Sequence, residues 1–129
     1  MSRAQIQREK LLNAVIFFSK KTRHCHKLKL FKLLFLLDFQ IYRETGRSTT
    51  GLEYFAWPKG PVPKSLFDEL KAPRPDMTRA VTLRQTPETD PDFTDKRLLI
   101  LPRLSFDEGC FTERELAGVE KLADLYRDA

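Results

Sequence analysis

The sequence has few of the residues that build disulfides, metal centres and membrane spans. Its 129 residues include only 2 cysteines, 2 histidines and 1 tryptophan. Disulfide-stabilised secreted domains usually show more cysteines, so we expect Cys25 and Cys110 to be free thiols and the protein to lie in the cytoplasm. The longest apolar runs, residues 14–18 and 33–37, are far shorter than the roughly 20 residues that cross a bilayer, and we expect no membrane contact.

The sequence also offers little material for a catalytic or cofactor site. Phosphate-cradling patterns such as GxxxxGK[ST] and GxGxxG are missing, and no carboxylates pair on an obvious cleft, so we expect no enzyme and no cofactor. His24, Cys25 and His26 form the only cluster of soft metal ligands. Adjacent side chains point in different directions, so at most two of them reach one ion, whereas structural zinc takes four ligands, and we expect no metal. A Cys–His nucleophile pair there would need a third, orienting group that the sequence does not suggest.

Acidic residues are scarce in the first half of the chain. Residues 1–71 carry 14 Lys and Arg against 6 Asp and Glu, a net charge of +8, whereas residues 72–129 carry 9 against 12, a net charge of −3. The densest basic stretch, residues 20–32, contains no acidic residue. It is a candidate docking surface for phosphate or for an acidic protein, with a merely solvated helix face as the alternative.

The apolar pattern predicts a mainly helical α+β fold in a single domain, residues 1–129, in which a buried central helix is surrounded by other helices and a small antiparallel β-hairpin. Helical spacing indicates a first helix over residues 3–20. Residues 27–43 are apolar almost all round, which indicates the central helix, and Gly46 ends it. A single narrow stripe of this central helix is expected to face solvent, and it consists of Lys29, Lys32, Leu36, Gln40 and Arg43.

An aromatic, proline-rich segment with the sequence FAWPKGPVPKSLFDEL overlaps the end of a short strand predicted at residues 52–57. Pro63 is expected to begin a short helix, because proline presets the backbone of a first helical turn. We expect Trp57 to pack against Phe55 and Phe67. In the alternative, Trp57 is partly exposed and anchors a partner, since interface energy concentrates in aromatic residues and arginine.

The last third of the chain predicts a hairpin and a helix. Residues 80–83 and 97–104 indicate two strands joined by a long, mobile polar tip over residues 85–96. The acidic part of this tip lacks the glycine and the final glutamate of a calcium loop, so we expect it to be solvated. A capping-box sequence at Thr112 predicts a last helix that begins near Glu113.

Asp38 is the one acidic residue in a core-like sector of the central helix, which it shares with Phe31, Leu34 and Tyr42. An unpaired buried carboxylate is costly, so we expect Asp38 to have a partner. We predict a hydrogen bond or ion pair that fixes a loop, for instance through a backbone N–H of the proline-rich segment. The alternative is that Asp38 faces a partner protein.

Three motifs in a fixed order resemble a known family. KLFKLLFLLD at residues 29–38, TGLEYFAW at residues 50–57 and PKGPVP at residues 58–63 are similar to the Panacea domain of SocA-like antitoxins, which also occurs in phage-associated proteins. The resemblance covers about residues 8–71 and is weaker through the later strands and the last helix. It gives a structural role to the motif residues Asp38, Thr50, Gly51, Pro58, Gly60, Pro61 and Pro63.

The resemblance implies a bacterial, prophage-associated antitoxin of a type II toxin–antitoxin system without enzymatic activity. Such a protein binds and neutralises a cognate toxin by direct contact, or presents the toxin to a cytoplasmic AAA+ protease, and the toxin comes from any of several unrelated families. A homodimer is compatible with this reading. Family members often continue past the last matched helix, so we expect that this chain lacks a C-terminal extension or is shortened.

Two functional hypotheses follow. In the first, the protein binds a toxin, and the residues expected at the contact are Lys29, Lys32, Gln40, Arg43, Trp57 and Lys59. In the second, it is a basic, phage-associated protein that binds nucleic acid and regulates its own expression, as the net charge of +5 allows. The sequence shows neither a helix-turn-helix pattern nor stacking aromatics among the basic residues, which favours the first hypothesis.

Overall fold

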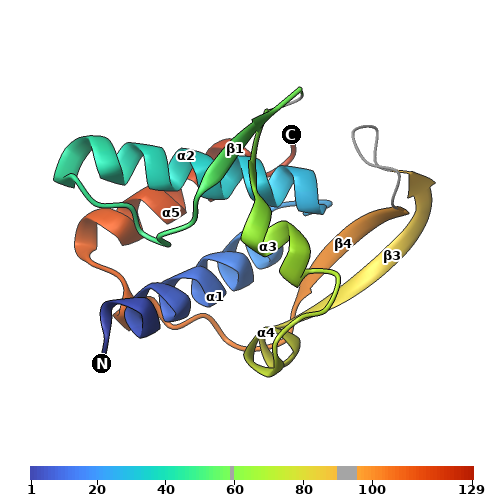
Figure 1. Cartoon of the computed structure of the whole chain (residues 1–129), viewed down its shortest axis with the longest axis horizontal. Helices are drawn as coiled ribbons and strands as arrows, with labels where there is room; N and C mark the ends of the chain where they lie inside the picture. Colours follow the sequence, from blue (N-terminus) through green and yellow to red (C-terminus); the bar gives the residue numbers. More distant parts are fainter. Residues whose placement is uncertain (59, 90–95) are drawn as a thin grey trace.

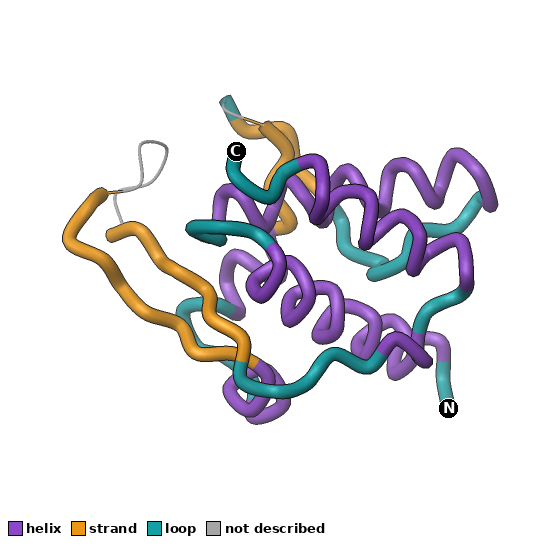
Figure 2. The backbone as a smooth tube through the Cα atoms, turned by 180° about the vertical axis from the view of Figure 1, so that it is seen from behind, coloured by secondary structure: helices purple, strands orange, loops and turns teal. Residues whose placement is uncertain are grey.

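A computed structural model describes residues 1–58, 60–89 and 96–129. Lys59 and most of the predicted acidic tip lie outside the described residues. The described chain contains five α-helices and two separate two-stranded antiparallel sheets, which confirms the mainly helical α+β class. Figures 1 and 2 show α1, α2 and α5 packed together, with the longer hairpin to one side.

The three long helices follow the sequence signals closely. α1 (Arg3–Lys21) starts with a capping box formed by Ser2 and Gln5, and α2 (Lys27–Thr45) ends at Gly46, whose φ is 80°. Glycine adopts this left-handed conformation without strain, which is why it ends the helix. α5 (Glu113–Leu125) begins with the predicted capping box, formed by Thr112 and Glu115, and Glu115 also forms an ion pair with Lys10 of α1 at 2.8 Å. All three predicted helices are therefore confirmed.

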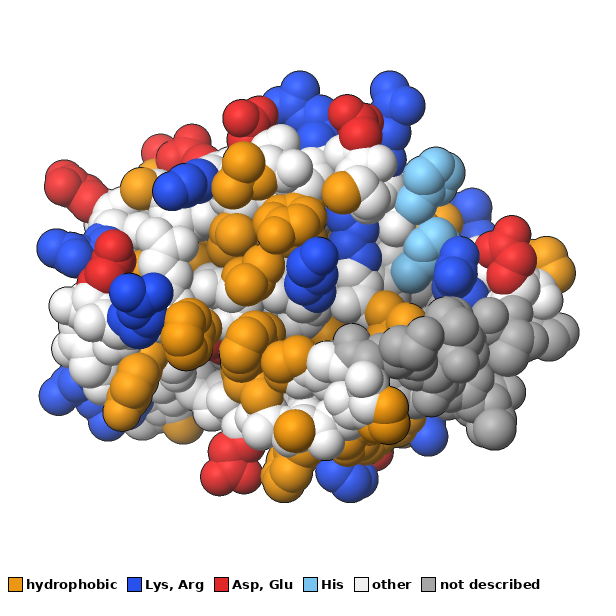
Figure 3. All heavy atoms as spheres, turned by 90° about the horizontal axis from the view of Figure 1, so that it is seen from above, with side chains coloured by type: hydrophobic (Ala, Val, Ile, Leu, Met, Phe, Trp, Pro, Cys, Tyr) orange, Lys and Arg blue, Asp and Glu red, His pale blue; other side chains and the backbone are white. Residues whose placement is uncertain are grey.

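The central position of α2 is confirmed, with one exception. Its buried side chains include Leu30, Leu34 and Leu37, all at most 1% exposed. Tyr42 was expected in the core but is 60% exposed, and its neighbour Phe39 is 50% exposed. No described element covers this face of α2, so apolar side chains gather at the surface that Figure 3 shows.

The proline-rich segment forms a hairpin, whereas the sequence predicted only its first strand. β1 (Tyr54–Trp57) pairs antiparallel with β2 (Gly60–Pro63), and Trp57 lies opposite Gly60. Pro63 is the residue before α3 (Lys64–Glu69) and not its first residue, so the helix begins one position later than predicted. β2 tolerates its prolines because this sheet has two strands only, and each strand has an unpaired edge.

The second hairpin is longer than the sequence indicated. β3 (Val81–Thr89) pairs with β4 (Lys96–Pro102), so residues 85–89, predicted as part of the tip, belong to a strand. The short helix α4 (Pro75–Ala80) was not predicted. Pro75 occupies its first turn, where the missing N–H of proline costs nothing. A single 3₁₀ turn, η1 (Glu108–Cys110), precedes α5.

Arg8 joins three helices through two paired contacts. Its guanidinium donates to both carboxylate oxygens of Glu69 on α3 at 2.6 and 2.7 Å, and to both oxygens of Asp76 on α4 at 2.7 and 3.0 Å. Burial raises the pKa of Glu69, but hydrogen bonds and attraction from Arg8 outweigh burial and hold this pKa below its usual value. The hydrogen bond with Arg8 likewise lowers the pKa of Asp76.

Replacing Arg8 tests this cluster. We expect Arg8→Met to lower the free energy of unfolding near neutral pH by roughly 2 kcal/mol, since two partly buried carboxylates lose their cation. Because both pKa values are lowered, the stabilisation is complete above the unfolded-state values of about 4 and disappears as the pH falls through the folded-state values. Urea denaturation over this pH range should therefore show wild type and variant converging in acid. Lys64→Met, which removes only the exposed pair with Asp68, is the matched control and should change little; a difference that stays constant with pH would contradict the assignment.

Candidate functional site

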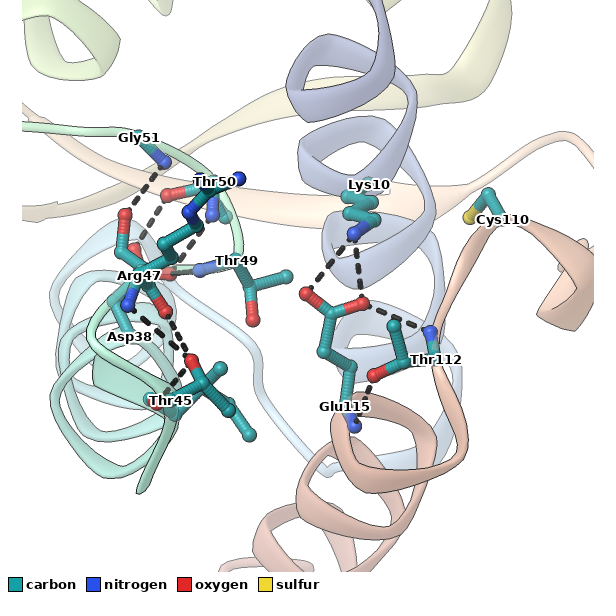
Figure 4. A network of polar contacts seen from close by, with 12 residues as sticks. Lys10, Asp38, Thr45, Arg47, Thr49, Thr50, Gly51, Cys110, Thr112 and Glu115 are labelled. Atoms are coloured by element: carbon teal, nitrogen blue, oxygen red, sulfur yellow. Dashed lines mark hydrogen bonds and ion pairs between the residues drawn. The ribbon is translucent and has the colours of Figure 1, made fainter. Parts of the chain in front are cut away.

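Asp38 is buried and accepts four hydrogen bonds from the chain that follows α2. Figure 4 shows the part of this network that involves Thr49 and Thr50. The backbone N–H groups of Thr49 and Thr50 donate to its Oδ1 at 2.9 Å each. The Thr50 hydroxyl and the Tyr54 phenol donate to its Oδ2, the phenol at 2.7 Å. The prediction that Asp38 fixes a loop is confirmed. The suggestion that its donor lies in the proline-rich segment is wrong, because all of the donors precede that segment.

Burial and hydrogen bonding act on Asp38 in opposite directions. Burial raises the pKa of Asp38 above its usual value, and the hydrogen bonds from Thr50, Tyr54 and the backbone reduce that shift without cancelling it, because they stabilise the carboxylate. Burial and the nearby Asp38 charge also raise the pKa of Tyr54, so its phenol keeps the proton that it donates. The network therefore joins one acceptor to donors that do not ionise at neutral pH.

Gly51 lets this loop pass close to α1. Its φ is 73°, and a Cβ at this position would lie only 2.5 Å from the side-chain Oε1 of Gln7. The left-handed backbone conformation therefore requires glycine, whereas the short contact alone would only displace the end of the Gln7 side chain. Since Gly51 and Thr50 are fixed, the chain enters β1 along a single path beside α2.

Aromatic contacts hold the β1–β2 hairpin against the helices. The ring of Trp57 meets that of Phe67 edge to face with centroids 5.3 Å apart, and Phe67 in turn packs on Phe31 at 6.4 Å. Tyr54 also contacts Phe35 edge to face at 5.3 Å. The predicted packing of Trp57 on Phe67 is confirmed, whereas Phe55, its other expected neighbour, is 46% exposed.

A groove of about 600 Å³ lies between α2, the β1–β2 hairpin and the end of α5. Most of its lining is apolar. Two cations stand among these residues: Lys29 donates to the carbonyl of Arg23 at 2.8 Å, and the Lys32 ammonium lies 4.6 Å from the centre of the Tyr126 ring. Figure 3 shows apolar side chains across this face with Lys and Arg among them and along its edges. The apolar lining includes Leu28, Phe31, Phe35, Leu36, Trp57 and Val62.

The groove unites some of the residues expected at a partner contact and leaves out others. Lys29, Lys32 and Trp57 line it together. Gln40 and Arg43 lie further along α2, where the Arg43 guanidinium stands 5.7 Å from the centre of the Phe39 ring. The sixth predicted residue, Lys59, is outside the described part of the chain.

Sequence reasoning missed the aromatic part of this surface. Phe35, Phe39 and Tyr42 are spaced four and three residues apart, so they follow one another on one face of α2. That spacing was visible in the sequence, but an amphipathic core helix shows the same pattern. Tyr126, just past the end of the last helix, is partly exposed at the groove.

In the His24–Cys25–His26 segment, the cysteine is buried, whereas the two histidines are at least partly exposed. Cys25 is 1% exposed, and burial raises its pKa to about 11, so it remains a thiol at neutral pH. The two histidine rings stack at 6.3 Å and border a separate hollow of about 690 Å³ together with Lys29 and Arg97. Burial, with Arg97 and His24, lowers the pKa of His26. Both cysteines are free, and the described residues contain no group of three or more His, Cys, Asp or Glu that fits a metal ion.

These features define a small, mainly helical α+β domain with an apolar, cation-flanked groove. Comparison with known families matches residues 30–128 to the family described as antitoxin SocA-like, Panacea domain. The chain belongs to this family, as its motifs predicted, and membership supports an antitoxin-type role with a toxin or similar partner and suggests a non-enzymatic one. Comparisons with curated proteins and with solved structures give no match. Within the described residues, no helix is long and apolar enough to cross a membrane.

The role of Asp38 leads to a graded prediction. Asp38→Asn should lower the free energy of unfolding by about 2 kcal/mol, because the amide loses the charge and turns an N–H₂ group toward donors. Tyr54→Phe, which removes a single hydrogen bond, should cost about 1 kcal/mol. Urea denaturation measures both, and amide exchange should accelerate in β1. If Asp38→Asn left stability unchanged but abolished partner binding, Asp38 would be a partner contact and not a structural anchor.

Proposed function

We propose that this protein neutralises a toxin encoded beside its own gene by binding the toxin directly. Membership of the SocA-like antitoxin family is the observation that carries the proposal. The exposed aromatic face of α2 agrees with it, since large exposed apolar patches mark interaction sites. Binding through this face covers a toxin surface and keeps the toxin from its target.

Direct binding can inactivate the toxin in two ways, masking and delivery to a protease. In masking, the toxin stays intact in an inactive complex. In delivery, the antitoxin presents the bound toxin to a cytoplasmic AAA+ protease, and the toxin is degraded. The two mechanisms need the same binding surface and differ in the lifetime of the toxin.

Co-expression tests the proposal. Inducing the product of the adjacent gene in bacterial cells should arrest growth, and co-expression of this protein should restore growth and allow the two proteins to be purified together. An empty vector is the control. The lifetime of the toxin after synthesis stops then separates masking, in which it persists, from delivery, in which it falls. Failure of both rescue and co-purification would count decisively against the proposal.

A second candidate function, nucleic-acid binding, is favoured by one observation. His24, His26, Lys29 and Arg97 border the hollow of about 690 Å³, and Glu88 is the only acidic side chain among its described lining residues. Phosphate contacts would make the affinity for DNA or RNA fall steeply with salt. For each phosphate contacted, a tenfold rise in salt concentration would lower the binding constant by nearly tenfold. Fluorescence anisotropy with labelled DNA and RNA over a salt series measures this slope. Undetectable binding even at low salt removes this candidate.

A further inference from the structure

The apolar surface of the groove continues along α2 beyond the hairpin. Leu28 and Phe35 line the groove, and Phe39 and Tyr42 extend the same helix face. Phe39 stacks on Phe35 with ring centroids 5.8 Å apart, so the surface has no break between them. Since Phe39 and Tyr42 are 50% and 60% exposed, a large part of this aromatic surface still faces solvent.

The length of this surface indicates what covers it. At 1.5 Å per residue, the distance along α2 from Leu28 to Tyr42 is about 21 Å. A small molecule fills a compact pocket, whereas a strip of this length matches about four turns of a second helix. The surface is therefore better suited to a segment of a protein chain.

The charged side chains that line the groove have one sign. Lys29 and Lys32 stand at the groove, and Arg43 flanks its continuation. The two acidic residues of α2 are engaged elsewhere: Asp38 is 3% exposed and holds the loop, and Glu44 pairs with Arg114 at 3.6 Å. No acidic residue lines the groove among the described residues. A segment with acidic residues beside its apolar ones complements this surface.

The walls of the groove favour a helix over an added strand. Strand addition needs backbone N–H and C=O groups at a free sheet edge, but the floor of this groove consists of side chains of α2. In β2, Pro61 and Pro63 also lack the N–H that a further strand would need. A helix, in contrast, places apolar side chains at i, i+3, i+4 and i+7 into such a groove.

We infer that the groove and its continuation along α2 receive an acidic amphipathic helix of the toxin. The inference rests on the proposed function, because the toxin is the protein that supplies the helix. The aromatic side chains of α2 hold the apolar face of the helix, and the three cations meet its acidic residues.

Affinity measurements with the adjacent gene product test this assignment. The double variant Phe39→Ala/Tyr42→Ala should weaken binding by about 30-fold, as expected when two exposed aromatic anchors are lost. Lys32→Glu should slow association and make the affinity less dependent on salt. Two matched controls lie away from α2 in Figure 1: Arg79→Glu for an exposed cation on α4, and Leu104→Ala for an exposed apolar residue beside α4. Thermal melting checks that every variant folds, and both controls should bind like the wild type.

A photoreactive phenylalanine at position 39 identifies the occupant. Cross-linking to an acidic, helical segment of the adjacent gene product supports the inference, and cross-linking to a basic or extended segment overturns it. If the wild type binds and rescues but the variants of Phe39, Tyr42 and Lys32 bind equally well, the helix assignment fails while the proposed function stands. If the wild type itself neither binds nor rescues, the proposed function fails and the assignment falls with it. Equal losses in the two controls also overturn it.

Discussion

The buried carboxylate of Asp38 determines where the chain goes after the central helix. A carboxylate removed from water is stable only if hydrogen-bond donors replace the lost hydration. Asp38 obtains these donors from Thr49, Thr50 and Tyr54, which all lie within the segment that follows α2. Folding cannot bury α2 without bringing this segment back onto it. One acidic side chain thus couples the burial of a helix to the position of the first strand.

That coupling also builds one wall of the groove. Because Tyr54 begins β1 and is bound to Asp38, the hairpin is fixed at its start, and the contact of Trp57 with Phe67 fixes its far end. Trp57 is both a packing residue and part of the groove lining, so the two roles considered for it are compatible. A wall held at both ends loses little conformational entropy when a partner binds, which favours affinity.

The local signals in the sequence predicted the helices well, and tertiary effects account for the rest. Capping residues and Gly46 act within a few positions, so the boundaries of α1, α2 and α5 were accessible, and the cost of burying Asp38 predicted a partner for it. The strand β2 was missed because prolines argue against strands unless the sheet edge is free. The exposure of Tyr42 depends on whether another element covers that face, which no local pattern records. The groove was missed for the same reason: its residues come from α2, the hairpin and Tyr126, which only the fold brings together.

The excess of basic residues in the first half of the chain becomes a local feature of α2 through the same network. Net charge alone attracts acidic partners over long distances but selects no surface. On α2 the burial of Asp38 and the pairing of Glu44 leave Lys29, Lys32 and Arg43 around exposed aromatic rings. Cations at the rim chiefly accelerate association, while desolvated aromatic side chains slow dissociation. Under the proposed binding, such a surface selects the sign of charge and the apolar spacing of a partner more than its particular sequence.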